Sequence, residues 1–180
     1  MAQGTRVYKT QLAISDSDRH CYEQLNLSLA LHPSETPERL VARLVAFALE
    51  YQEGLEFGKG ISNAEDATIW RRSLDERVLH WIEIGQPDAE RMTKFYRRSE
   101  KLSLFCYAAN SERWWQQHKA SFSKLSRMEV FVLDWGSLTQ LAAGLDKRIE
   151  FQLVKNENHL YLSLNDVQVD FELQSLDLDP

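Results

Sequence analysis

The sequence contains little cysteine and no long apolar run. Its two cysteines, Cys21 and Cys106, both fall in segments expected to be strands, and neither has a cysteine or histidine nearby at ligand spacing. A reduced, intracellular protein is therefore the simplest interpretation. No stretch approaches the roughly 20 consecutive apolar residues that a membrane-spanning helix needs. No apolar signal core precedes Asp16, so we expect a cytoplasmic protein without a membrane partner.

Motifs for several common chemistries are also absent. The histidines are scattered, without the HxH or HxxxH spacing that zinc sites use. They are His20, His32, His80, His118 and His159. GxGxxG, Walker A and GxSxG motifs do not occur. Zinc, dinucleotide, nucleoside-triphosphate and simple acyl-transfer sites therefore lack support.

Charge is unevenly distributed along the chain. The net charge is −6, which argues against wholesale attraction to nucleic acid. Between Asp88 and Arg127, however, nine lysines or arginines stand against four acids, and residues 165–180 hold five acids and no base. A basic middle with an acidic end is compatible with a nucleic-acid-binding face. Charges spread over a solvated surface explain the same counts equally well.

Hydrophobic periodicity predicts a mixture of strands and helices. The predicted elements are strands at 7–15 and 21–31, a helix at 36–51, a strand at 78–84, a helix at 88–99, a strand at 102–108, a helix at 111–124, a strand at 128–133, a helix at 137–145, and two or three antiparallel strands within 147–176. A polar loop is expected from 54 to 77. Thr36 and Asp88 are the expected helix caps, with Pro37 at a first helical position.

This order combines parallel crossovers with hairpins at both ends of the chain. It predicts an α/β fold of mixed type, with one central mixed sheet flanked by helices. The length of 180 residues suits one compact domain with a sizeable core. No internal repeat or linker interrupts the pattern, so a single domain over 1–180 is expected.

Glu83 is the most informative polar residue. It lies one position before the end of an otherwise apolar strand and is followed by Ile84 and Gly85. A carboxylate in such a strand is costly unless a cation or hydrogen-bond donors meet it. Because ligand sites in open α/β sheets gather at the carboxyl ends of strands, a functional role is one explanation. A structural pairing with a nearby arginine, or a helix cap, is the other.

Acidic residues elsewhere could join Glu83. Asp66 lies in a polar loop that would have to fold back towards the strand, and Glu65 is adjacent to it. Two carboxylates brought together form a hard-oxygen site suited to Mg²⁺ or Mn²⁺. Glu53, just beyond the first helix, is a further candidate ligand. Acids in loops and at helix ends are more often simply solvated.

A basic stripe follows on the next helix. Its members recur at i, i+3, i+7 and i+10, and are Arg91, Lys94, Arg98 and Lys101. Lys94 could hold a water or a phosphate, and Arg91 with Arg98 could grip a phosphate backbone. A solvated helix face is the commoner explanation of a lone basic stripe. Trp114 and Trp115 could stack on bases, although adjacent aromatics on a helix more often divide between core and rim.

Three segments, at His32–Arg39, His80–Lys94 and Asn110–Gln117, resemble the YaeQ family of bacterial proteins. The second contains Trp-Ile-Glu-x-Gly-x-Pro-Asp-x-x-Arg-x-x-Lys, which is long and specific. The resemblance runs nearly the full length of the chain. It implies a variant of the PD-(D/E)XK nuclease core, in a small cytoplasmic protein with a link to transcription elongation.

Carried over by this resemblance, Asp66 takes the place of the first motif acid, with Glu65 as the alternative, and Glu83 takes that of the second. The family pattern of such nucleases places lysine two residues after the second acid, where this chain has Gly85. Lys94 is the natural replacement. The Pro87–Asp88 pair more plausibly caps a helix than holds a metal.

The resulting hypothesis is a metal-dependent nuclease, with a monomer favoured. Asp66, Glu83 and the Ile84 carbonyl would hold Mg²⁺, while Lys94 orients a water and Arg91 with Arg98 positions the backbone. A second hypothesis is a protein that binds nucleic acid or the transcription machinery without catalysis, which the missing lysine and the acidic net charge favour. A third is a protein-interaction module that uses the Trp114–Trp115 helix or the acidic end.

Overall fold

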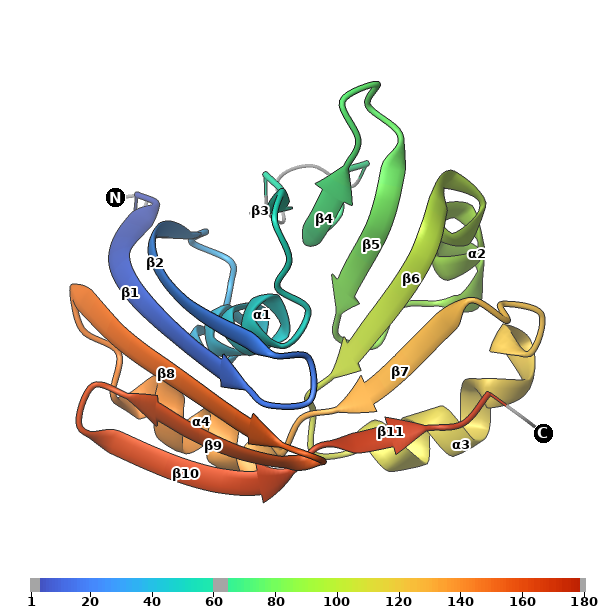
Figure 1. The fold of residues 1–180 in the computed structure, drawn as a ribbon. Coiled ribbons are helices and arrows are strands. Elements are labelled where there is room, and N and C mark those ends of the chain that lie inside the picture. The colour runs from blue at the N-terminus through green and yellow to red at the C-terminus, as the bar shows by residue number, and fades with distance from the viewer. Residues whose placement is uncertain (1–3, 60–64, 179–180) are drawn as a thin grey trace. The chain divides into compact units, whose positions relative to one another are not determined.

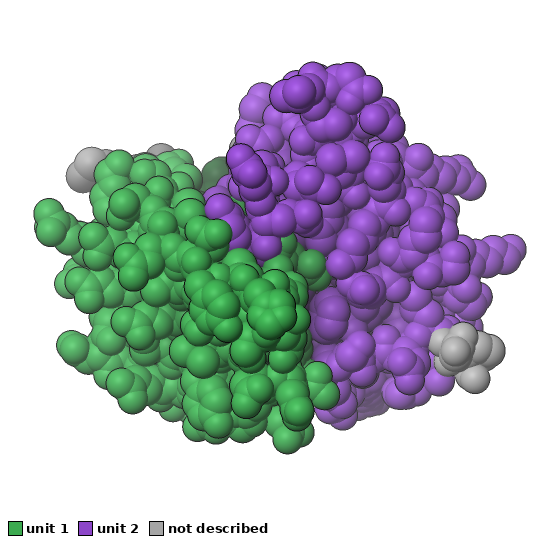
Figure 2. All heavy atoms as spheres, viewed as in Figure 1, with its two compact units in different colours: residues 1–50, 134–173 green, residues 51–133, 174–180 purple. Residues whose placement is uncertain are grey.

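The computed structural model of the protein describes residues 4–59 and 65–178. The chain forms two compact units, coloured separately in Figure 2. Unit 1 combines residues 1–50 with 134–173, and unit 2 combines residues 51–133 with 174–180. Each unit is built on a sheet of its own.

The sheet of unit 1 joins the two ends of the sequence (Figure 1). Its strands are β1 (Arg6–Asp16), β2 (Cys21–Leu31), β8 (Arg148–Asn156), β9 (His159–Leu164) and β10 (Val167–Glu172), in the order β10-β9-β8-β1-β2. Strand β1 pairs antiparallel with β2 and parallel with β8. The predicted opening hairpin is confirmed, and the C-terminal strands extend it.

Two helices belong to unit 1, α1 (Pro37–Leu49) and α4 (Trp135–Ala143), and they contact each other. The Thr36 hydroxyl accepts a hydrogen bond from the Arg39 N–H at 3.3 Å, which confirms the predicted cap. Alternate residues of β1, among them Leu12 and Ile14, are buried, as a half-buried strand requires.

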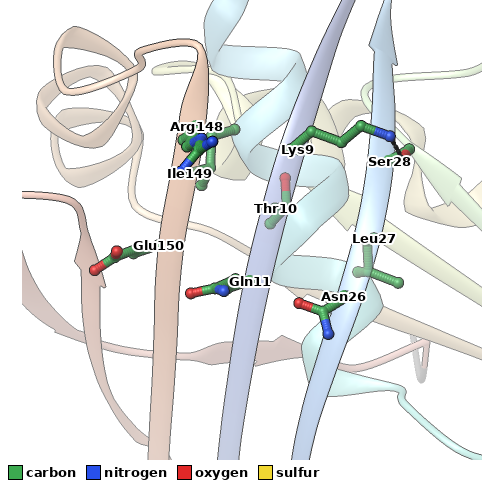
Figure 3. A pocket seen from close by; sticks show the side chains of 9 residues that line it. All are labelled: Lys9, Thr10, Gln11, Asn26, Leu27, Ser28, Arg148, Ile149 and Glu150. Atoms are coloured by element: carbon green, nitrogen blue, oxygen red, sulfur yellow. Dashed lines mark hydrogen bonds between the residues drawn. The ribbon is translucent and has the colours of Figure 1, made fainter.

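The other face of the unit 1 sheet is polar and hollowed (Figure 3). The hollow has a volume of about 500 Å³. Side chains from β1, β2 and β8 line it, including Lys9, Gln11, Asn26 and Glu150. None of the lining residues carries a role in the sequence-based hypotheses.

The sheet of unit 2 has a parallel centre. Its strands are β3 (Leu55–Phe57), β4 (Ile69–Arg72), β5 (Val78–Ile84), β6 (Ser99–Cys106), β7 (Met128–Val132) and β11 (Gln174–Leu176), in the order β11-β7-β6-β5-β4-β3. The parallel strands β5, β6 and β7 are connected by α2 (Ala89–Arg98) and α3 (Ser111–Phe122). Both helices contribute to one apolar core with these strands.

The mixed α/β class is confirmed, with a central mixed sheet and extra hairpins at both ends of the chain. These hairpins form a second sheet, because they pair with each other through β1 and β8. The expected loop at 54–77 also contains β3 and β4, which are too short for an alternating pattern to be recognised. The single domain over 1–180 stays a prediction.

No helix within residues 4–59 and 65–178 has the length and apolar character needed to cross a bilayer.

A buried polar pair lies in β5 and β6. His80 Nε2 is 2.8 Å from the Ser103 hydroxyl, and both side chains are buried. Burial lowers the pKa of His80 from 6.5 to about 3, with smaller contributions from Lys101 and Arg71. The imidazole is therefore neutral in the folded protein near neutral pH.

This pKa shift makes stability depend on pH. Between about pH 3 and 6.5 the unfolded chain binds a proton at His80 that the folded chain does not, so stability falls as the pH drops. From pH 6.5 to 5 we expect the free energy of unfolding to fall by up to about 2 kcal/mol more in the wild type than in His80→Gln. Urea unfolding at both pH values measures the difference. His118→Gln, which removes an exposed histidine, should keep the wild-type pH dependence, and an unchanged slope in His80→Gln would contradict the assignment.

Candidate functional site at the carboxyl end of strand β5

Glu83 lies in β5 on the face that α2 covers. Only 3% of the residue is exposed. Because side chains alternate along a strand, Glu83 shares this face with Trp81. The Trp81 ring stacks on Phe95 of α2 with the ring centroids 4.2 Å apart. The carboxylate is therefore held at the edge of an aromatic layer.

Every oxygen of the Glu83 carboxylate has a donor. Oε1 accepts hydrogen bonds from the Thr68 hydroxyl and from the Ile84 N–H, the latter at 3.3 Å. Oε2 accepts from the Trp81 indole N–H at 3.4 Å and lies 3.7 Å from a guanidinium nitrogen of Arg91. The pairing of Glu83 with an arginine, which the sequence left as one of two explanations, is present. A buried carboxylate with these partners is electrostatically satisfied.

The register of β4 brings Thr68 to Glu83. Ile69 lies opposite Ile82 in the antiparallel pair of β4 and β5, so Thr68 follows opposite Glu83. Asp66, two residues before Thr68, lies outside β4 and is half-buried. The sequence hypothesis that this segment folds back towards Glu83 therefore agrees with the strand register.

Gly58 allows this close approach. Its N–H donates to the Thr68 carbonyl at 3.1 Å. A Cβ at Gly58 would lie 1.8 Å from the Ala67 carbonyl oxygen, so a larger residue cannot fit without moving the backbone. The segment before β4 thus depends on a glycine in the loop after β3.

Glu53 lies in the turn just before β3 and is exposed. Its place among the metal ligands stays a prediction.

Helix α2 begins as predicted and carries Arg91, Lys94 and Arg98 of the basic stripe, whereas Lys101 lies in β6 and pairs with Glu129. The Asp88 carboxylate caps it by accepting the Arg91 N–H at 2.7 Å. Lys94 Nζ lies 2.5 Å from Glu65 Oε1, and an Arg98 guanidinium nitrogen lies 3.0 Å from Glu65 Oε2. Hydrogen bonds from Lys94 and then from Arg98 lower the pKa of Glu65. The stripe thus holds Glu65, the residue next to the predicted Asp66.

These donors do not fit a metal ion held by Asp66, Glu83 and the Ile84 carbonyl. Across the described ranges 4–59 and 65–178, no three Asp, Glu, His or Cys side chains gather as metal ligands. Both Glu83 oxygens already accept hydrogen bonds, and a divalent ion would have to take the place of Arg91. The metal site and the roles of Asp66, Glu83 and Lys94 in catalysis stay predictions.

Gly85 occupies the position where a nuclease motif would have lysine. Its φ is +111°, a backbone conformation that side-chain-bearing residues rarely adopt. Space is not the constraint, because a Cβ there would come no closer than 3.9 Å to Tyr107 Cε1. The lysine is therefore excluded by the backbone of the turn that leaves β5.

The two resembling segments of unit 2 meet beyond β5 and β6. Gln86 donates a side-chain hydrogen bond to the Asn110 side-chain oxygen at 2.9 Å, which ties the start of the loop before α2 to the start of α3. Within α3, Trp115 is buried and stacks on Phe122, whereas Trp114 is half-buried beside His118. The expected division between core and rim is confirmed.

The third resembling segment, in unit 1, has a structural role. Glu35 is buried and lies 2.7 Å from the Arg43 Nε and 2.9 Å from an Arg39 guanidinium nitrogen, just before α1.

Neither cysteine is placed as a nucleophile: burial raises the pKa of Cys106 to about 12 and also raises the pKa of Cys21. Sequence reasoning missed two partners of Glu83: Thr68, which donates from the residue before β4, and Trp81, which donates from β5 itself. No sequence pattern reports such side-chain hydrogen bonds.

The fold and site define a mixed α/β protein in which a buried carboxylate near a strand end faces the basic helix that follows it. The chain belongs to the YaeQ family: the family model described as YaeQ protein matches residues 1–173. A Salmonella typhi protein described as "Uncharacterized protein YaeQ" is 33% identical over 175 residues, covering 97% of this chain and 96% of that protein. The protein of the same description from Escherichia coli (strain K12) is 30% identical over 164 residues, 91% of each chain.

Solved structures of the family have the same fold. The crystal structure of YaeQ protein from Pseudomonas syringae matches with a TM-score of 0.92 and 36% identity, covering 98% of both chains. The structure of YaeQ protein from Xanthomonas axonopodis pv. citri matches with a TM-score of 0.91 and 33% identity, over 96% of this chain and 98% of that one.

Removing the Glu83 carboxylate should destabilise the protein. Glu83→Ala leaves three buried donors and the Arg91 charge without their acceptor, and we expect a loss of about 2–4 kcal/mol. Urea unfolding measures this change. Glu90→Ala, at an exposed position of α2, should change stability by less than about 0.5 kcal/mol. Equal stability of Glu83→Ala and wild type would mean that the carboxylate is not held for structural reasons.

Restoring the motif lysine should fail. We expect Gly85→Lys to lose about 1–3 kcal/mol of stability, because the cost comes from the positive φ. Gly85→Ala should lose a similar amount, since side-chain size is not limiting. The same change at Gly4, which has no neighbouring atoms within 4 Å of its Cβ position, is the matched control. A fully stable Gly85→Lys variant would show that the turn can adopt another conformation.

Proposed function

We propose that unit 2 binds nucleic acid through the cationic side chains of α2 and α3, without cleaving it. The two helices contact each other. Their exposed basic residues include Arg91, Lys94, Arg97, Arg98 and Arg113. Phosphate contacts from such side chains supply most of the affinity of proteins that bind nucleic acid without reading its sequence.

The convergence of Lys94 and Arg98 on one carboxylate is the observation that carries this proposal. Their nitrogens reach the two oxygens of Glu65 at 2.5 Å and 3.0 Å. Two cations from successive turns of α2 are therefore arranged to hold one small anion. A phosphate group presents oxygens of the same kind to such a pair.

Glu83 acts in this proposal as a positioning residue. It fixes Arg91 at the first turn of α2, while 41% of the arginine side chain remains exposed. The guanidinium also lies over the Phe95 ring, 5.0 Å from its centroid. Both contacts restrict Arg91 and leave its outer edge available to a phosphate.

Metal-dependent phosphodiester hydrolysis is the second candidate. One observation favours it: the Thr68 hydroxyl donates to Glu83, which brings the segment that holds Asp66 to the carboxyl end of β5. The contact of Glu83 with Arg91, at 3.7 Å, is also the longest of its contacts. The PD-(D/E)XK relationship stays a prediction, as does a protein partner in transcription, which would remain in a pull-down after nuclease treatment.

Binding should be salt-sensitive and should depend on the stripe. We expect Lys94→Ala/Arg98→Ala to weaken binding of a fluorescent 20-base-pair DNA and, because the two cations hold one phosphate, to reduce the magnitude of the slope of log K against log[salt] by about 0.9. Fluorescence polarisation across a salt series measures both, with single- and double-stranded DNA and RNA as probes. Lys147→Ala/Arg148→Ala in unit 1 makes the same charge change and should leave the slope unchanged. Equal slopes in all three proteins would contradict the proposed surface.

A cleavage assay separates the two candidates. The same nucleic acids are incubated with Mg²⁺ or Mn²⁺ and wild type, Glu83→Gln or Lys94→Ala, where Glu83→Gln keeps the side-chain volume. We expect no metal-dependent cutting by the wild type. Cutting that is lost in both variants would instead establish the nuclease, and equal cutting by all three would indicate a contaminant.

A further inference from the structure

Glu65 forms a bridge between two cations of α2. Its carboxylate oxygens contact Lys94 at 2.5 Å and Arg98 at 3.0 Å, and the side chains of the three residues are 59%, 51% and 44% exposed, respectively. The bridge spans separate parts of the chain, since Glu65 precedes β4 and the cations lie on α2. Because the three side chains are partly exposed, ions in solution can reach Lys94 and Arg98 and exchange with the Glu65 carboxylate.

We propose that the Glu65 carboxylate occupies the position of one phosphate of bound nucleic acid, so that binding requires a phosphate to displace it. This inference rests on the proposed function and adds regulation of the same site. Glu65 acts as an intramolecular competitor. It lowers the affinity of the stripe for phosphate, and it excludes anions that bind Lys94 and Arg98 more weakly than it does.

Charge matching supports the exchange. A phosphodiester and an ionised carboxylate each carry one negative charge, so the anion paired with the two cations has the same charge before and after displacement. Contacts with the core of the protein also position Arg98. Arg98 lies over the Trp81 ring, 5.7 Å from its centroid, and Trp81 in turn stacks on Phe95. The position of the arginine therefore depends on the core as well as on Glu65.

The strength of the competition is modest. Exposed ion pairs are weak, and the loss of two such pairs corresponds to an affinity gain of roughly 2- to 30-fold. This is the range expected for Glu65→Gln, which keeps the shape of the side chain and removes its charge. The gain should be largest at low salt, where pairs of exposed charges are least screened.

The experiment measures binding of the 20-base-pair DNA by fluorescence polarisation for wild type, Glu65→Gln and Glu90→Gln. Glu90 is an exposed acid in the first turn of the same helix, so its variant changes the net charge equally. We expect the gain in Glu65→Gln to exceed that in Glu90→Gln several-fold. Equal gains would overturn the inference, because they would reflect net charge alone.

A second comparison uses the Lys94→Ala/Arg98→Ala background. If Glu65 competes for these two cations, Glu65→Gln should gain no more affinity than Glu90→Gln once they are absent. A gain from Glu65→Gln that still exceeds that of Glu90→Gln in this background would overturn the inference. Thermal unfolding of each variant confirms that the binding differences arise in folded protein.

The outcomes separate this inference from the proposed function. Salt-sensitive binding that needs Lys94 and Arg98 but is unaffected by Glu65→Gln would retain the function and reject the competitor. Binding detected only in Glu65→Gln would support the inference directly. Absence of binding in wild type and in all variants would reject both.

Discussion

The burial of one carboxylate constrains most of unit 2. Glu83 cannot remain ionised in an aromatic layer without partners, and each partner comes from a different place. Thr68 is supplied by the residue before β4, Trp81 by β5 itself, and Arg91 by the first turn of α2. The register of β4 against β5, and the position of α2 over the sheet, are therefore fixed by the same group. The positive φ of Gly85 then turns the chain away from β5, and α2 begins where Arg91 can reach Glu83.

Sequence periodicity was sufficient for most elements and for their ends. The caps at Thr36 and Asp88 could be predicted because their side chains bond the backbone only three residues away. The two sheets could not be predicted in the same way. Alternation along β1 shows which face is buried, but it does not show that β8, more than a hundred residues later, is the parallel neighbour. The strands β3 and β4 have only three and four residues, so their alternation could not be told from a loop.

The candidate site was only partly predictable, because a single sequence reveals an unusual residue but not the contacts that it makes. Glu83 stood out because a charged residue within an apolar strand is anomalous in a single sequence. The choice between Glu65 and Asp66 was not accessible, since one residue of register reverses the direction in which a side chain points. The structure places Glu65 against Lys94 and Arg98 of the basic stripe, whereas Asp66 lies half-buried in the bend before β4. Likewise, the positive φ of Gly85 explains why this position does not hold a lysine, and a backbone angle cannot be read from the amino-acid composition.

The net charge of segment 88–127 shows how a count from the sequence can overestimate the charge of a surface. Segment 88–127 has nine bases and four acids, a balance of +5. Three acids from outside it contact its cations: Glu83 with Arg91, Glu65 with Lys94 and Arg98, and Glu129 with Lys101. One base from outside, Arg77, contacts Glu100, so the balance with these partners is +3. A surface of this kind attracts polyanions only as far as they replace carboxylates already present. Affinity then depends on a difference between two anions, so it is small at high salt and sensitive to single acids. An acidic protein can in this way carry a phosphate-binding helix without binding every polyanion it meets.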